Sequence, residues 1–445
     1  MNKELLGKLL CDKKYETIKT NLINMNEYDI ASLIEELPSD ELIKTFRLLT
    51  KSQATDVFVN LDKEVQTNLI SSLTKNEAKD IIEDMFTDDA ADLFEEMPAV
   101  MVTSLLANVS NDTRTTINRL LRYPDNSAGS LMATEYIRFK KGLSIKDCIK
   151  KIRRYKEEFV SYDSFFVTDL DRTLLGTVSV KDMLINDPDT LIDDIMQKCE
   201  HPIYTLMDQE EVAGIFQDYN YSCLPVVDME DRLVGVITID DIVDIMEEEA
   251  TEDIEKMAAI VPTDKSYDKI SVFDTFKARI PWLLLLMVSA TFTGKIIQSF
   301  EDRLTACAIL TAFIPMLMDT GGNAGGQASV SIIRALSLND IEFKDLFHVI
   351  FKEFRIAILC AIVLGICNFF KMLIVDHVTI MVASVVCITL FITIIIAKLI
   401  GSTLPMLAKK IGLDPAVMAS PFITTIVDAC SLLIYFNVAS IILGL

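Results

Sequence analysis

The sequence is poor in basic residues, in histidine and in paired cysteines, and each shortage excludes a class of function. Its 445 residues hold 42 Lys and Arg against 65 Asp and Glu, and this net charge of −23 is unsuited to binding nucleic acid. Nine scattered cysteines form no C-x-x-C pair, which argues against a zinc site or a disulfide framework. His201, His348 and His377 are isolated, and no P-loop or nucleophile–base pair is found. We therefore expect no enzyme.

The negative charge is confined to the first part of the chain. Residues 1–276 carry 30 Lys and Arg against 55 Asp and Glu, whereas residues 277–445 carry 12 against 10. The first part is typical of a soluble acidic region, and the second is apolar enough to be membrane-embedded. The N-terminus, MNKELLGKLL, lacks an apolar run of signal-peptide length, so we expect the acidic part to stay in the cytoplasm.

Residues 1–125 are predicted to form a cytoplasmic domain of short helices stacked into a small superhelix. Helix breakers or caps recur about every 12 residues, and short apolar-periodic segments such as ATDVFVNL lie between them. Thr74 and Glu77 have the spacing of a capping box, in which the hydroxyl and the carboxylate satisfy free N–H groups at a helix start.

Residues 126–250 contain an internal repeat. The segments FFVTDLDRTLLGTVSVKD at 165–182 and LPVVDMEDRLVGVITIDD at 224–241 are 59 residues apart, and helical patterns at 144–156 and 208–219 precede them. Each unit is predicted to run helix, strand, turn, strand, helix, in an α+β fold. The repeat resembles a tandem pair of CBS domains, a module that often binds adenine nucleotides or ions between its two copies.

Two short motifs of this repeat are candidate nucleotide contacts. Thr238 and Asp241 resemble the family's ribose-contacting T-x-x-D, and Ser179 with Asp182 forms the weaker copy. The alternative is that both motifs are ordinary helix N-caps. The sequence supports the two interpretations about equally.

A long polar helix is expected over residues 242–276, and its part from 251 to 276 would connect to the membrane region. It is rich in carboxylates that share a face, and like charges at that spacing repel unless a cation lies among them. A solvated acidic face is the alternative. The candidate carboxylates of this helix are Glu248, Glu249, Glu252 and Asp253, and a second acidic cluster contains Asp88, Asp89 and Asp92.

Residues 277–445 are predicted to form an α-helical membrane domain of five spans. The expected spans are about 280–298, 304–333, 354–375, 378–397 and 417–443. Loops on the side of the acidic region carry most of the Lys and Arg, as the positive-inside rule requires. Five spans would place the C-terminus outside the cell membrane, with the N-terminal domains in the cytoplasm.

Two carboxylates, Asp319 and Asp428, fall inside these apolar spans. Each costs at least about 2.5–3.5 kcal/mol at the centre of a helix in a bilayer, so both are expected to face an aqueous interior. A protonated Asp bonded to nearby backbone is the alternative. Oxygen ligands without His or Cys suit a hard cation such as Mg²⁺ or Ca²⁺. The other polar or small candidates of this pathway are Gly321, Gly322, Asn323, Gly325, Gly326, Thr424 and Thr425.

The chain resembles the MgtE family of magnesium channels in the order of these regions and in three segments. The segments are PMLMDTGGNAGGQAS at 315–329, LDPA at 413–416 and PFITTIVD at 421–428. The resemblance implies a homodimer with one pore on its two-fold axis. It implies that Asp428 holds a hydrated Mg²⁺, that the GGNAGGQ segment lines the pore and that a helix at about 253–276 plugs it. Regulatory Mg²⁺ would close the channel by binding cytoplasmic carboxylates, among which Asp414 is fixed by its own motif and the others are Asp88, Asp92 and the acidic helix. Some members bind ATP at the CBS pair.

Other functions were weighed against this one. A channel or carrier for Co²⁺, Mn²⁺ or Ca²⁺ is the nearest alternative, because selection among hydrated ions depends on pore width. An intramembrane aspartyl protease would use Asp319 and Asp428 as a dyad, but the D-T-G-G order differs from the G-x-G-D of the known membrane dyads. A nucleotide sensor with a membrane anchor would not need five spans and two buried carboxylates.

Overall fold

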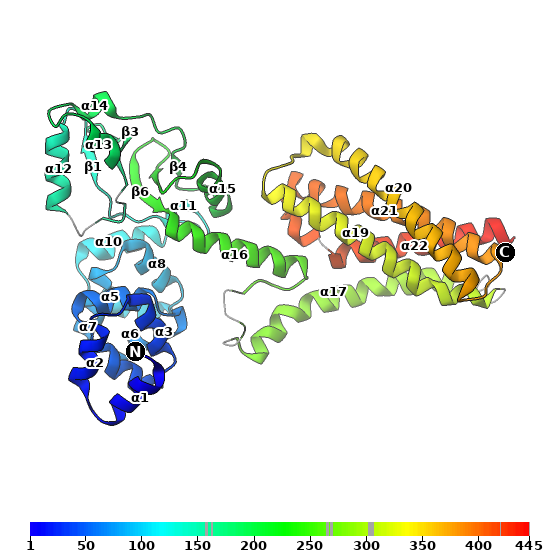
Figure 1. Ribbon diagram of the computed structural model, residues 1–445, viewed down its shortest axis with the longest axis horizontal. Helices are drawn as coiled ribbons and strands as arrows, with labels where there is room; N and C mark the ends of the chain where they lie inside the picture. The colour runs from blue at the N-terminus through cyan, green and yellow to red at the C-terminus, as the bar shows by residue number, and fades with distance from the viewer. Residues whose placement is uncertain are drawn as a thin grey trace. The chain divides into compact units, whose positions relative to one another are not determined.

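The computed structural model describes residues 1–155, 159–161, 163–263, 267, 270–300, 307–418 and 420–444. The chain divides into two compact units, Met1–Met246 and Glu247–Leu445 (Figure 1). The first unit holds the short helices and all the strands, and the second holds the long helices. The division falls about 30 residues before position 277, where the sequence changes from acidic to apolar.

Ten short helices open the first unit. They are α1 (Lys3–Cys11), α2 (Tyr15–Leu22), α3 (Glu27–Glu35), α4 (Ser39–Phe46), α5 (Lys51–Val59), α6 (Lys63–Ser72), α7 (Lys75–Asp84), α8 (Thr87–Glu95), α9 (Ala99–Leu106) and α10 (Asn111–Leu120). Helices two apart in sequence pack together, as in the pairs α3–α5, α5–α7 and α8–α10. One continuous apolar core runs through them. The predicted superhelix is therefore confirmed.

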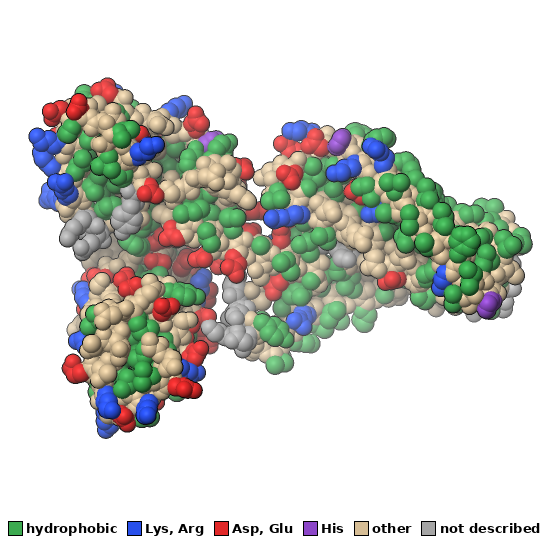
Figure 2. All heavy atoms as spheres, viewed as in Figure 1, with side chains coloured by type: hydrophobic (Ala, Val, Ile, Leu, Met, Phe, Trp, Pro, Cys, Tyr) green, Lys and Arg blue, Asp and Glu red, His purple; other side chains and the backbone are tan. Residues whose placement is uncertain are grey.

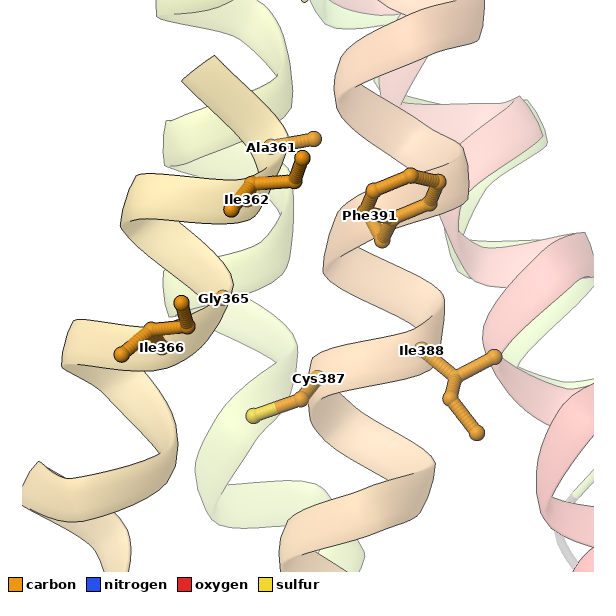
Figure 3. Close-up of a pocket in the computed structure, with 7 residues that line it drawn as sticks. All are labelled: Ala361, Ile362, Gly365, Ile366, Cys387, Ile388 and Phe391. Atoms are coloured by element: carbon orange, nitrogen blue, oxygen red, sulfur yellow. The ribbon is translucent and has the colours of Figure 1, made fainter. Parts of the chain in front are cut away.

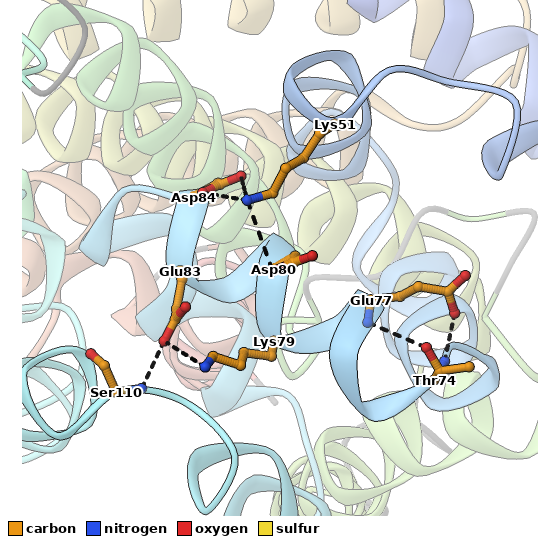
Figure 4. Close-up of polar contacts among 8 residues, drawn as sticks. All are labelled: Lys51, Thr74, Glu77, Lys79, Asp80, Glu83, Asp84 and Ser110. Carbon is orange, nitrogen blue, oxygen red and sulfur yellow. Dashed lines mark hydrogen bonds and ion pairs between the residues drawn. The ribbon is translucent and has the colours of Figure 1, made fainter.

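The predicted capping box lies at the start of α7. The backbone N–H of Glu77 donates to Thr74 Oγ1 over 3.3 Å, and the N–H of Thr74 donates to Glu77 Oε2 over 2.7 Å (Figure 4). Two N–H groups that a helix start leaves free are satisfied in this way.

Ionic contacts from α7 reach the neighbouring helices. Lys51 Nζ of α5 lies 3.1 Å from Asp84 Oδ2 and 3.8 Å from Asp80 Oδ1. The N–H of Ser110, the N-cap of α10, donates to Glu83 Oε1 over 2.8 Å (Figure 4). These side chains are largely exposed, so the contacts contribute less to stability than the apolar core does.

The rest of the first unit consists of two small sheets built alike. The first has the order β1-β2-β3 and the second β4-β5-β6; in each, the first pair is parallel and the second antiparallel. The register shifts between Val167 and Thr168 and, 59 residues later, between Val226 and Val227. The strands are β1 (Arg138–Lys140), β2 (Ser164–Thr168), β3 (Leu174–Ser179), β4 (Ile203–Tyr204), β5 (Cys223–Val227) and β6 (Leu233–Thr238). The repeat is confirmed, with β1 and β4 as unpredicted additions.

The helices of this repeat match the predicted pattern. They are α11 (Ala128–Leu131), α12 (Ile145–Arg154), α13 (Val180–Ile185), α14 (Ile192–Ile195), α15 (Gln209–Tyr219) and α16 (Ile239–Met257). The tips of the two strand pairs are joined, because Leu174 N–H donates to Asp231 O over 2.9 Å and Leu233 N–H donates to Arg172 O over 3.0 Å.

The prediction of one helix over residues 242–276 is wrong. α16 ends at Met257, and the next helix starts at Val272. Ala259 takes a positive φ of 56°, and the Ile260 N–H donates to Glu255 O over 2.9 Å, which is the hydrogen-bond pattern that closes a helix C-terminus. Pro262 follows and prevents continuation. The expected connecting helix at 251–276 is therefore split into the end of α16 and the start of α17.

The second unit is a bundle of long helices. They are α17 (Val272–Ser299), α19 (Ile314–Ser337), α20 (Leu346–Ile374), α21 (Ile380–Lys410) and α22 (Ser420–Leu443), with 3₁₀ turns at Ala308–Phe313, Phe343–Asp345 and Pro415–Met418. Within the described ranges, four segments are long and apolar enough to cross a membrane: Val272–Ser299, Phe343–Ile374, Ile380–Lys410 and Pro415–Leu443. The remaining long helix, α19, starts at Ile314, so the expected helix start at 304 is wrong; residues 304–306 lie outside the described residues.

The arrangement of this unit places α19 inside. It packs against α21 and α22, while α20 packs on α21 and α17 on α22. Large apolar side chains are exposed on α17 and α20, as a lipid-facing surface requires (Figure 2). The face of α19 that its neighbours cover is built of small and apolar residues, among them Gly321, Gly322 and Ala324.

Candidate functional site

Three glycines allow α19 to approach its neighbours closely. A Cβ at Gly321 would lie 2.7 Å from Thr393 Cγ2, and one at Gly322 would lie 2.8 Å from Thr424 Cγ2. A Cβ at Gly325 would lie 2.9 Å from Ile423 Cγ2 and 3.1 Å from the carbonyl oxygen of Ala397. Gly326 is buried as well. Within the described part of one chain, these glycines allow α19 to pack closely against other helices. That they line a pore stays a prediction.

The opposite face of α19 carries a polar stripe. Asp319, Asn323, Gln327 and Ser331 are spaced four residues apart, and all four are exposed. The Asn323 side-chain amide donates to Asp319 Oδ1 over 3.1 Å, and Ser331 Oγ donates to Gln327 O over 2.9 Å. Such a stripe is costly against acyl chains, so it requires contact with water or with another protein surface.

Asp428 lies on α22, a helix that packs against α19. Its carboxylate lies close enough to Asp319 for the two charges to interact. Asp428 Oδ1 is buried, and no hydrogen-bond partner for it exists among the described residues. Thr424 lies one turn earlier on α22, and Thr425 Oγ1 donates to Pro421 O over 3.1 Å. The structure thus brings together the two carboxylates that the sequence placed in different spans.

A second polar cluster in this unit joins the end of α16 to the 3₁₀ turn before α22. Lys256 Nζ lies 2.6 Å from Glu252 Oε1 and 2.6 Å from Asp414 Oδ2. Asp253 Oδ2 accepts a hydrogen bond of 3.2 Å from Ser337 Oγ. Burial alone would lower the pKa of Lys256, but the hydrogen bonds to Asp414 and Glu252 raise it above its ordinary value. Burial raises the pKa of Asp253.

Three of the predicted regulatory carboxylates, Glu252, Asp253 and Asp414, are therefore neighbours. Lys256 at their centre was missed by sequence reasoning, although the i, i+4 spacing from Glu252 to Lys256 marks an intrahelical ion pair. Glu248 and Glu249 lie about one turn earlier on α16.

The first unit gathers a separate set of carboxylates where α8 meets the start of α16. Burial raises the pKa of Asp88 well above its ordinary value, with a further contribution from Asp89. Burial and the nearby charge of Asp241 raise the pKa of Asp89 to about 7, and burial raises that of Asp241 to about 6. Burial also raises the pKa of Asp92. Asp89 was not among the predicted regulatory residues, although it adjoins Asp88 in sequence.

Neither acidic set is a complete metal site in this chain. Across the described ranges, no three His, Cys, Asp or Glu side chains come close enough together to hold a metal ion. A divalent ion at either place would need a further ligand from water or from another surface.

The two candidate nucleotide motifs form cap-like contacts. Thr238 Oγ1 donates to Asp241 Oδ2 over 2.7 Å, and Ser179 Oγ donates to Asp182 Oδ2 over 2.7 Å. Ser179 is the N-cap of α13, because its Oγ accepts the Asp182 N–H over 3.0 Å. The hydrogen bonds expected of helix caps are therefore present at both motifs, and nucleotide contact stays a prediction.

Comparisons with known proteins cover each region of the chain. Residues 314–438 match the MgtE family, described as divalent cation transporters, and residues 25–126 match the MgtE intracellular N domain. Residues 128–188 and 192–248 match CBS domains. With several candidate spans in its second unit, the chain is a multi-pass membrane protein.

Named relatives extend this match over nearly the full length. The chain is 31% identical to the magnesium transporter MgtE of Bacillus subtilis over 436 residues, which cover 97% of this chain and 95% of the relative. It is 35% identical to that of Thermus thermophilus over 331 residues, which cover 74% of this chain and 73% of the relative.

A solved structure resembles the first part of the chain. The cytosolic domain of the Mg²⁺ channel MgtE in complex with ATP aligns with a TM-score of 0.52 and 30% identity, over 54% of this chain and 98% of that one. On these matches, the chain belongs to the MgtE family of divalent cation transporters.

Proposed function

We propose that the chain is one protomer of a homodimeric channel that conducts Mg²⁺ down its electrochemical gradient into the cytoplasm. The observation that supports this most directly is the polar stripe of α19 together with Asp428, whose buried Oδ1 has no hydrogen-bond partner in the described part of the chain and whose charge interacts with Asp319. Two copies related by a two-fold axis would enclose these groups between them and give the stripe the water that it needs. We choose Mg²⁺ as the transported ion because the relatives are named magnesium transporters.

Selection of Mg²⁺ would act on the hydrated ion. Mg²⁺ gives up its water reluctantly, so a carboxylate and side-chain amides that contact its water shell suit it better than a dry cage does. Asp428 would attract the ion electrostatically, and Asp319 and Asn323 would contact the hydration shell along the path. The glycine positions Gly321, Gly322, Gly325 and Gly326 allow the close packing that fixes the width of this path.

Regulation would use the cytoplasmic carboxylates. Bare carboxylates on neighbouring surfaces repel each other, and a divalent ion between them converts that repulsion into a bridge. Abundant Mg²⁺ would then favour a closed state through its tighter binding to that state. Candidate ligands are Asp88, Asp92, Glu248, Glu249, Glu252, Asp253 and Asp414. In this orientation the first unit lies in the cytoplasm and the C-terminus outside.

ATP at the CBS pair is a further element of the proposal. It is supported by the ATP complex of the similar cytosolic domain, and Thr238 with Asp241 is the preferred ribose contact. The Thr238 hydroxyl donates to Asp241 Oδ2, so the other carboxylate oxygen, Oδ1, would be the acceptor for a ribose hydroxyl. The alternative of an intramembrane protease has no support from the family, which is one of transporters.

The test is ion flux into liposomes that contain the purified full-length protein. We expect entry of Mg²⁺ at low internal Mg²⁺, slower entry of Ca²⁺, Mn²⁺ and Co²⁺, and inhibition at high internal Mg²⁺. Asp428→Asn should reduce Mg²⁺ entry by at least roughly tenfold, because it removes the charge that attracts the ion. Asp340→Asn, at an exposed residue after α19, is the matched control and should leave flux unchanged. Full flux through Asp428→Asn would refute the assignment of the site.

A further inference from the structure

An open apolar groove lies between α20 and α21. It has a volume of about 300 Å³ and is lined by Ala361, Ile362 and Gly365 of α20 and by Cys387, Ile388 and Phe391 of α21, among others (Figure 3). Gly365 keeps it open, because a Cβ built there would meet no atom within 4 Å. The groove is on the outside of the helix pair, since Ile362 and Ile388 are both 44% exposed.

The turns of α20 that precede the groove carry cationic and aromatic side chains. Phe351, Arg355, Ile358 and Ile362 follow one another at spacings of three or four residues, so they lie along one face of the helix. Phe351 is 63% exposed, and the Arg355 guanidinium lies over its ring at 5.9 Å. An exposed Lys352 adjoins them.

The positive charges at this end are not neutralised by the chain itself. Within the described ranges, neither Lys352 nor Arg355 forms an ion pair. The acidic residue between them in sequence, Glu353, is buried against α21, where its Oε2 lies 4.0 Å from Lys398 Nζ. The two exposed cations are thus available to an external anion.

The separation of the two ends fits half of a bilayer. Ten residues of helix from Arg355 to Gly365 span about 15 Å at 1.5 Å per residue. That is roughly half of a hydrocarbon core about 30 Å thick. A molecule with an anionic head at Arg355 would therefore reach the groove with an apolar chain of ordinary lipid length.

We propose that this face of α20 and α21 is a binding site for one anionic phospholipid. Its phosphate head lies at Lys352 and Arg355, and one acyl chain occupies the groove at Gly365. Basic residues at the ends of membrane helices attract anionic lipids, and the exposed phenyl ring at the same level suits the interface. A free phosphate ion would leave the apolar groove unused, and a zwitterionic phospholipid would bring its own cationic group close to Lys352 and Arg355, which weakens its attraction to them.

The test places a fluorescent reporter in the groove of the full-length protein. Trp282 is the only tryptophan in the sequence, so Trp282→Phe combined with Phe391→Trp gives a single reporter there. The protein is reconstituted in phosphatidylcholine vesicles that contain a fixed minor fraction of brominated phosphatidylglycerol or of brominated phosphatidylcholine. Bromine quenches tryptophan on contact, so quenching measures occupancy. We expect the anionic lipid to occupy the site roughly tenfold more readily, as two cations near the headgroup predict.

Two variants separate the head from the chain. Lys352→Gln with Arg355→Gln should abolish the preference for the anionic lipid, whereas Gly365→Leu should fill the groove and reduce quenching by either lipid. The controls are Lys295→Gln and Gly294→Leu on α17, where an added Cβ also meets no atom within 4 Å. Both controls should leave quenching unchanged.

Three outcomes would overturn the proposal. The first is equal quenching by the two lipids, and the second is an anionic preference that survives Lys352→Gln with Arg355→Gln. The third is weak quenching by both lipids in the unaltered groove, which would show that a second copy of the chain covers it. Monodisperse elution of each variant in detergent establishes that it has folded.

Discussion

At the scale of single residues, Lys256 is the side chain that should compete most directly with Mg²⁺. Its ammonium group lies between Glu252 and Asp414, where a divalent ion would otherwise be attracted. A lysine there satisfies both carboxylates with one positive charge, and Mg²⁺ must displace it to bind them. Lys256 would therefore set the concentration at which Mg²⁺ acts on this cluster.

Lys256→Met should make the channel more sensitive to cytoplasmic Mg²⁺. Removing the competing cation leaves two carboxylates facing each other, so the Mg²⁺ concentration for half-inhibition should fall by roughly three- to tenfold. The effect is limited because the side chains are partly exposed to solvent. Liposome flux at graded internal Mg²⁺ measures it, with Lys344→Met as the control at an exposed ion pair. An unchanged or raised half-inhibition concentration would contradict this role.

At the scale of elements, the helix stack of the first unit depends on its caps. Thr74→Ala removes one side of the capping box of α7 and should lower the free energy of unfolding by about 1 kcal/mol. Urea unfolding of the full-length protein measures the loss, as the change in the free energy of its first unfolding transition. Thr115→Ala is the matched control, because the Thr115 hydroxyl donates to Asn111 O inside α10 and caps no helix start. A loss equal to that of the control would show that the box does not stabilise the stack.

Element boundaries also show what sequence reasoning could and could not provide. The strand pairs and the capping box were predictable, because alternation and capping are local patterns. Strands β1 and β4 were missed because three and two residues are too few to show a period. The end of α16 was missed because the acidic run continued the helical pattern, although Pro262 marked the break. The packing of Gly401 against the Gly325 carbonyl depends on tertiary structure and leaves no local pattern.

At the scale of the whole molecule, stability should depend on pH through the carboxylates of the first unit. The pKa values of Asp89 and Asp241, about 7 and about 6, exceed the ordinary value of 3.8 because both groups are buried near other acids. The folded chain thus holds protons that the unfolded chain releases between about pH 4 and pH 7. The contribution of this cluster to stability therefore falls as pH rises through that range.

Asp89→Asn should remove much of that dependence. At pH 7.5 and low Mg²⁺ the variant should be more stable than the unaltered protein, by on the order of 2 kcal/mol, and the advantage should shrink to roughly a third of that at pH 5. Thermal unfolding at both pH values measures the difference, and Mg²⁺ should narrow it at pH 7.5. Asp187→Asn, at an exposed loop residue, should show neither effect. An advantage that is equal at both pH values would exclude titration as the cause.

The candidate site was predictable only in part. Asp319 and Asp428 were identified as candidates, because a charge in an apolar span is visible in sequence. Their proximity was not visible, since it depends on how α19 crosses α22. Asp89 was noted in an acidic cluster, but its proximity to Asp241 appears only in the folded chain, as does the contact of Lys256 with Asp414.

The exposed side chains along α19 have a consequence for biogenesis. A copy inserted alone would expose an acid, two amides and a hydroxyl to hydrocarbon, and the hydrogen bonds within the stripe satisfy only part of their polar atoms. The penalty is relieved only when another molecule shields that flank. In the proposed homodimer the partner copy supplies this cover, so lone copies should be short-lived intermediates during synthesis.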